Sequence, residues 1–229
     1  MTTLSVTIDQ LFQQAVVKLQ YRAMNPKDTN AVGKLYEVQV LWQVLDWMAN
    51  AGYRIRHIPP NSSQPWRMVL PEKPASANKA VFSYFSATKL GEQLEVWTSL
   101  EFLTLSYSLL PTSPVPLQTY AAMHELDVAV FKGPIKCKYP AHDDLIFGAS
   151  CKATPFKKDY LRELLGLRRE TAMFKNGGAS TAPWFVPPVT CPGVVNAVPR
   201  SVLALFCLDA SVLNYGSVST LGAFTYHFL

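Results

Sequence analysis

The sequence predicts an α/β fold in which a mixed β-sheet is flanked by helices, with a helix at the N-terminus and a β extension at the C-terminus. Apolar residues at helical spacing precede a long β-rich region, and a second helical segment separates that region from two further strand-like runs. With 49% hydrophobic and 16% charged residues, the 229-residue chain can bury a substantial core. Its length fits one large domain, or one domain with extensions.

Two helices open the predicted fold. The spacing of apolar residues predicts a helix over residues 7–22, and a stronger one from Asn30 to Asn50 that Gly52 closes in the usual C-terminal position. We divide the chain into a helical extension (1–30), a core (31–209) and a C-terminal strand that completes the sheet (210–229). The first 30 residues could dimerise, dock a partner or cover the core.

The β-rich region begins after an irregular, proline-containing stretch from Pro59 to Asn78. We expect a helix from Phe156 to Lys175, which is entered through the capping pair Thr154-Pro155 and ends at Asn176-Gly177-Gly178. The expected strands are Ala80–Thr88, Leu94–Leu110, Met123–Lys132, Asp144–Ala153, Ser201–Asp209 and Val218–Phe228.

Composition restricts the class of protein and its location. The net charge is 21 − 16 = +5, which fits a nucleic-acid partner without requiring one. The four cysteines lack metal-ligand spacing, which is typical of a reduced protein. We find neither a signal peptide nor a run of about 18 apolar residues. We therefore expect a soluble, cytoplasmic protein with no membrane contact.

Two inner strands carry polar residues among apolar neighbours. Alternation places Glu125 and Asp127 on the same face as Ala129 and Phe131, and on the second strand Ser150 shares a face with Lys152. An acid and an amine on adjacent central strands cost free energy unless they pair or bind a metal. The pattern predicts a functional site at Asp127 and Lys152, and a structural ion pair between them is the alternative.

Three segments together resemble the PD-(D/E)xK nuclease superfamily. They are the helix that opens with Gly33-Lys-Leu-Tyr-Glu37, the strand Glu125-Leu-Asp127-Val and the strand Ala149-Ser-Cys-Lys152. The resemblance covers roughly residues 31–209 and implies a restriction-endonuclease-like fold. It implies hydrolysis of DNA phosphodiester bonds with Mg²⁺ or Mn²⁺ in defence, recombination or mobile-element function, and RNA remains open as the substrate.

The resemblance also implies a role for each residue of the motif. Asp127 would be the central metal ligand and the Cys151 backbone carbonyl a second one. Lys152 would orient or deprotonate the attacking water, and Glu37 would add a ligand from the helix. Hard oxygen ligands of this kind suit Mg²⁺, which neutralises charge at the phosphate and lowers the pKa of a bound water.

One position departs from the motif, because Ser150 stands where the family has its second carboxylate. A neutral hydroxyl removes one unit of negative charge from the site. Replacement acids are Glu163 and Glu170 on the following helix, with Glu163 favoured, or Glu125 and Glu101 on the strands. If none of these acids serves, the chain is a catalytically inactive subunit that binds nucleic acid or scaffolds a protein complex.

A basic group on the predicted helix borders the site. It contains Lys157, Lys158, Arg162, Arg168, Arg169 and Lys175. Its members Lys157, Lys158, Arg162 and Arg169 are candidates for binding a nucleic-acid backbone, with DNA favoured over RNA. An ordinary solvated helix face explains the same pattern. A homodimer would suit a nuclease that cuts both strands, but the sequence does not demonstrate one.

Overall fold

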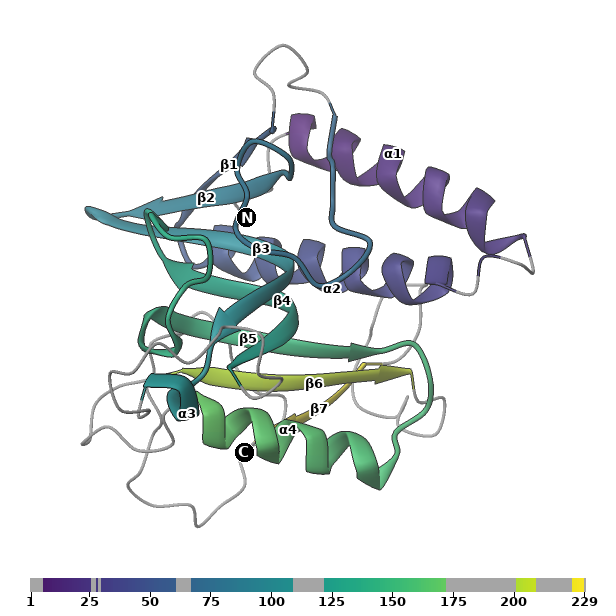
Figure 1. Cartoon of the computed structure of the whole chain (residues 1–229). Coiled ribbons are helices and arrows are strands. Elements are labelled where there is room, and N and C mark those ends of the chain that lie inside the picture. The colour runs from purple at the N-terminus through teal and green to yellow at the C-terminus, as the bar shows by residue number, and fades with distance from the viewer. Residues whose placement is uncertain are drawn as a thin grey trace.

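The computed structural model describes residues 6–25, 28, 30–60, 67–108, 122–171, 201–208 and 224–228. Within these residues, seven strands form one sheet in chain order, and β5 and β6 are the one parallel pair among them (Figure 1). The strands are β1 (Arg54–Ile58), β2 (Tyr84–Lys89), β3 (Glu92–Leu103), β4 (Met123–Lys132), β5 (Leu145–Lys152), β6 (Val202–Leu208) and β7 (Phe224–Phe228). The predicted α/β class with a mixed sheet between helices is confirmed.

Helices cover both faces of the sheet. Helices α1 (Val6–Ala23) and α2 (Asn30–Asn50) lie on one face, and α4 (Lys158–Glu170) lies on the other with the short α3 (Leu105–Ser108) (Figure 1). A single-turn 3₁₀ helix, His142–Asp144, leads into β5. Each face buries its own apolar cluster, one beneath α1 and α2 and one beneath α4. The fold is therefore a three-layer arrangement with a sheet that is apolar on both sides.

Helix α1 contributes to the core. Its Ile8, Phe12 and Leu19 are buried, and the Phe12 ring stacks on Phe85 of β2 with centroids 5.7 Å apart. Of the roles that the sequence left open for the first 30 residues, covering the core is the one observed for α1.

The predicted elements agree with the structure best where the apolar pattern is longest. Helix α2 has the predicted bounds, and Gly52 follows it with φ of +91°, a value that favours glycine. Three differences concern the β-rich region. The sequence did not predict β1, β2 begins only at Tyr84, and β3 ends at Leu103.

The predicted strand Leu94–Leu110 is wrong at its end, because a turn of helix, α3, replaces it there. The Thr104 hydroxyl accepts a hydrogen bond from the Tyr107 backbone N at 3.1 Å, so it caps that turn. The entry predicted for α4 is also wrong, since the helix begins at Lys158. Thr154 instead shares a 2.7 Å hydrogen bond with the Tyr160 hydroxyl. Residues 172–200 and 209–223, which hold Gly177, Gly178 and part of the predicted last strand, lie outside the described residues.

Among the helices that the structure describes, none is both long enough and apolar enough to cross a membrane.

Candidate active site between α2, β4 and β5

The candidate site lies where two central strands stop pairing with each other. The pairing of β4 with β5 ends at Val128 and Ala149, beyond which β4 continues beside β3 and β5 continues beside β6. The Asp127 side chain lies at this separation, where its Oδ2 accepts a hydrogen bond from the Cys151 backbone N at 2.6 Å. A carboxylate thus satisfies a backbone donor that β4 no longer pairs with, and its position is fixed.

The alternation of side chains along β4 breaks at Asp127. Ala129 and Phe131 belong to the core beneath α4, whereas Asp127 and its neighbour Val128 both face α2. The prediction that Asp127 shares a face with Ala129 and Phe131 is therefore wrong. The break coincides with Ser99 of β3, which lies between the residues paired with Val128 and Leu126 and has φ of +47°. A serine in this left-handed region costs roughly 1–3 kcal/mol, and such strain clusters at functional sites.

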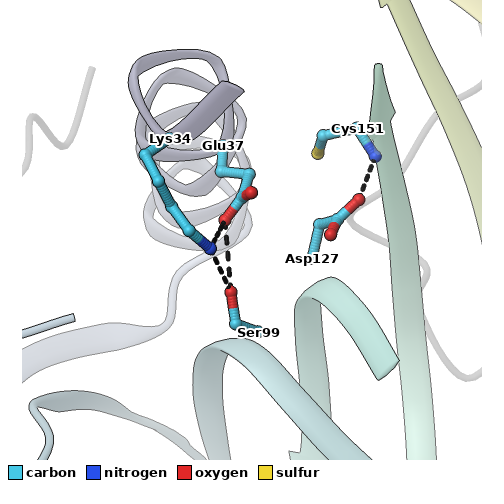
Figure 2. Close-up of polar contacts among 5 residues, drawn as sticks. All are labelled: Lys34, Glu37, Ser99, Asp127 and Cys151. Atoms are coloured by element: carbon cyan, nitrogen blue, oxygen red, sulfur yellow. Dashed lines mark hydrogen bonds and ion pairs between the residues drawn. The ribbon is translucent and has the colours of Figure 1, made fainter. Parts of the chain in front are cut away.

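Two charged side chains from α2 point toward the same place. Figure 2 shows Lys34 and Glu37 extending from the helix to Ser99, with Asp127 and Cys151 opposite them. The Lys34 Nζ donates to Glu37 Oε2 at 2.7 Å and to Ser99 Oγ at 2.5 Å, and Ser99 Oγ donates to the same glutamate oxygen at 3.3 Å. The strained serine therefore links the strand to the helix.

A cavity of about 290 Å³ opens among these groups. Its charged lining residues are four acids and two lysines: Glu37, Glu72, Glu125, Asp127, Lys34 and Lys73. The segment that carries Glu72 and Lys73 is held on β3 at Ala75, whose N donates to Ser99 O and whose O accepts from Glu101 N, each at 2.9 Å. The first turn of α2 also borders the cavity, and the positive end of the helix dipole favours negatively charged carboxylates nearby.

Three acids of the cavity, Glu37, Glu125 and Asp127, have raised pKa values. Burial, followed by the charge of Asp127, raises the pKa of Glu125 to about 7. The same two causes raise the pKa of Glu37, although Lys34 and Ser99 oppose the change. Burial also raises the pKa of Asp127, against the hydrogen bond from Cys151 and the nearby lysines. The cavity therefore holds more buried negative charge than its lysines offset.

Lys152 lies near Asp127 but pairs with a different acid. Its Nζ is 2.9 Å from Glu163 Oε1 on α4, and it sits 5.5 Å from the centre of the Tyr160 ring. Among the described residues no ion pair joins Lys152 to Asp127. Burial lowers the pKa of Lys152, but Glu163 and then Asp127 outweigh that effect, so the pKa is raised. The charges of Lys152 and Asp127 therefore interact electrostatically without direct contact.

Ser150 and Cys151 lie on β5 between Ala149 and Lys152. Ser150 is buried, with 4% of its surface exposed. The Cys151 backbone N faces Asp127, and burial, followed by the charges of Asp127 and Glu37, raises the pKa of its thiol well above the usual value. The partly buried thiol is therefore protonated and contributes packing rather than charge.

The remaining candidates lie apart from the cavity. Glu170 accepts hydrogen bonds from Ser106 N and Oγ at 3.0 and 2.7 Å, so it is a cap of α3 and not the missing ligand. On α4 and just before it, Lys157 and Lys158 are exposed, and Arg162 pairs with Asp159 at 3.0 Å. The side chain of Arg169 is outside the described part.

Sequence reasoning gave no role to Lys34 and Ser99. Lys34 precedes Glu37 by three residues, so the two share a helix face, and this spacing was a usable signal. The positive φ of Ser99 had no signal, because nothing in a run of strand-forming residues indicates a left-handed serine.

The donor chemistry of the cavity fits a hard divalent cation. Within the described ranges no group of three or more His, Cys, Asp or Glu side chains is arranged to hold a metal ion. Mg²⁺ needs less than such a cage, because it keeps several waters and binds through one or two carboxylates. Asp127 with Glu37 or Glu125 could supply those oxygens, and a cation would offset the repulsion that adds to burial in raising the pKa values of Glu37 and Glu125.

In comparisons with protein-family models, with curated proteins and with solved structures, nothing matches the chain.

Proposed function

We propose that the chain is a metal-dependent nuclease of the PD-(D/E)xK type that hydrolyses phosphodiester bonds in DNA. The observation that carries the proposal is the convergence of Glu37, Glu125 and Asp127 on one cavity beside the separation of β4 from β5. Clustered carboxylates with raised pKa values destabilise a fold unless a bound ligand offsets their charge. Such groups mark functional sites.

In this proposal Asp127 is the central ligand, since the hydrogen bond from Cys151 N holds it in one orientation. Glu37 or Glu125 supplies the charge that Ser150 cannot. Bound there, Mg²⁺ or Mn²⁺ would neutralise charge developing on the phosphate and lower the pKa of the attacking water.

Two lysines can stabilise charge on the phosphate. Lys152 is the motif lysine and interacts with Asp127 over a distance, while Lys34 lies inside the cavity and pairs with Glu37. The proposal keeps Lys152 in the catalytic role and gives Lys34 the positioning of Glu37. In the proposal, exposed Lys157, Lys158 and Arg162 hold the DNA backbone at α4, on the side of the sheet where Lys152 contacts Glu163 and Tyr160.

The test is cleavage of plasmid and oligonucleotide DNA and of RNA with Mg²⁺ or Mn²⁺. We expect Asp127→Ala and Lys152→Ala each to reduce the rate by about 10²-fold or more, because each removes a group required near the reacting phosphate. The matched control is Asp144→Ala, which removes an exposed aspartate of the 3₁₀ helix before β5, outside the acidic cavity. Thermal unfolding checks that each variant is folded. Undiminished cleavage by the Asp127 and Lys152 variants would contradict the assignment.

A second candidate is an inactive nuclease-fold subunit that binds nucleic acid or scaffolds a complex. It is favoured by the buried Ser150 in place of an acid and by the pairing of Lys152 with Glu163. A mobility shift in EDTA distinguishes the two candidates, since binding without cutting in Mg²⁺ or Mn²⁺ favours the subunit. A gain of cleavage in Ser150→Glu would identify a decayed site with intact architecture.

A further inference from the structure

A second cavity, of about 260 Å³, lies between α1, α2 and residues 67–72. It shares Lys34, Glu37 and Glu72 with the acidic cavity, so the two lie on either side of the Lys34–Glu37 ion pair. A molecule that extends from one cavity to the other passes these three side chains.

The second cavity combines an apolar wall with basic groups. Ala15, Leu19, Val38, Met68 and Leu70 form its apolar lining. Lys18 on α1 and Arg67 on the facing segment are exposed residues of the lining. A third basic residue, Arg22, pairs with Asp28 at 2.7 Å and with Glu72 at 2.8 Å. Apolar surface with a few placed polar groups is typical of small-molecule sites, and exposed lysine and arginine suit a phosphate.

Thr98 provides an independent indication of a ligand. It lines the cavity from β3, is only 3% exposed, and its Oγ1 has no hydrogen-bond partner. A buried hydroxyl without a partner is a cost to the fold, and native proteins rarely leave one without a reason. The oxygen is closed off from solvent, so a ligand meets it when the side chains above it move aside.

We propose that this cavity binds one nucleotide of the strand that the acidic cavity cleaves, and this inference rests on the proposed nuclease function. The base lies against the apolar wall and hydrogen bonds to Thr98 Oγ1, while Lys18 and Arg67 bind the phosphate. The volume of about 260 Å³ is slightly below the range of drug-sized pockets, roughly 300–1,000 Å³, so it admits one nucleotide and not a duplex segment. The substrate is therefore a strand whose base is unpaired at this position.

The test is calorimetric titration of the full chain with deoxynucleoside monophosphates, with inorganic phosphate as a second probe, in EDTA. Wild type should bind at least one of the nucleotides more tightly than phosphate. Thr98→Val, which removes the hydroxyl and keeps the shape, should weaken binding about two- to tenfold without lowering thermal stability. Lys18→Glu and Arg67→Glu should each weaken it about tenfold or more. Lys136→Glu, at an exposed lysine outside the lining, should leave it unchanged.

Asp127→Asn separates this inference from the proposed function, because it should stop cleavage and leave nucleotide binding intact. Cleavage by the wild type together with undetectable nucleotide binding, or with binding that no cavity variant changes, would overturn the inference alone. Binding that depends on Thr98, Lys18 and Arg67 without any cleavage would overturn the nuclease alone and support the nucleotide pocket.

Discussion

Buried acidic side chains in two regions of this protein have different surroundings. Glu95 of β3 is 1% exposed, and three donors surround its carboxylate: Lys79 Nζ lies 2.6 Å from Oε1, Ile135 N donates to the same oxygen at 3.2 Å, and Trp97 Nε1 donates to Oε2 at 3.1 Å. Lys79 also lies 5.0 Å above the Tyr84 ring, which stacks on Trp97. This network joins three segments of chain and leaves neither carboxylate oxygen without a donor.

The cavity beside α2 differs in its charge balance. Glu37, Glu125 and Asp127 share it with Glu72 but only two lysines, and repulsion adds to burial in raising the pKa of Glu37 and Glu125. The comparison teaches that a buried charge on a central strand does not itself identify a function. The two regions differ in whether their buried negative charge is balanced. A structural network balances that charge with donors and cations, whereas a ligand site keeps an excess of it.

The largest expected effect is a difference in the free energy of unfolding between variants of Glu95 and of Asp127. Glu95→Ala should lower the free energy of unfolding by about 3 kcal/mol, because two buried N–H donors lose their acceptor. Asp127→Asn should change it by less than about 1 kcal/mol, since the amide oxygen can still accept from Cys151 N and repulsion is relieved. Urea unfolding of both variants measures this. Equal losses in the two variants would remove the contrast.

The pH dependence of stability sharpens the same contrast. The folded pKa values of Glu37, Glu125 and Asp127 are raised, so the native state binds more protons than the unfolded state above the ordinary carboxyl pKa. Without metal, the free energy of unfolding should therefore fall as the pH rises from about 4.5 to about 7. Glu125→Gln should remove the upper part of this slope. A flat or rising profile in the wild type would contradict the assigned imbalance.

The smallest expected effect compares one glycine from each region. A Cβ at Gly33, beside the acidic cavity, meets nothing within 4 Å, so Gly33→Ala should raise the free energy of unfolding by about 0.5–1 kcal/mol through helix propensity. A Cβ at Gly133 would lie 3.2 Å from Glu95 Cγ and 3.3 Å from Gln93 O. Gly133→Ala should therefore destabilise the protein. Thermal unfolding measures both, and the opposite order would show that the Glu95 network has room to adjust.

Periodicity predicted much of this fold, because apolar patterns report which face of a segment is buried. Helix α2 and the bounds of β4 follow directly from it, whereas α3 is capped by a local hydrogen bond of Thr104 and α4 begins later than the pattern predicts. Terminal residues of elements carry little periodic signal. A strand as short as β1 has the same limitation.

The candidate site could be predicted only in part. Glu37 and Asp127 could be placed near each other, since a motif on a helix and a motif on a strand suffice for that. The pairing of Lys152 with Glu163, and the strained Ser99 of β3, depend on strand separation and side-chain contacts that no linear pattern encodes. Glu95 also shows why a charged residue on a central strand was not a specific signal in the sequence. This glutamate lies on the neighbouring strand β3 and forms a closed network instead.

Binding of Mn²⁺ followed by calorimetry tests the central assignment most directly. We expect a saturable Mn²⁺ site in the wild type that Asp127→Asn abolishes, that Glu125→Gln weakens and that the exposed control Asp159→Asn leaves unchanged. Manganese that fails to bind the wild type, or that binds the Asp127 variant with the same affinity, would contradict it.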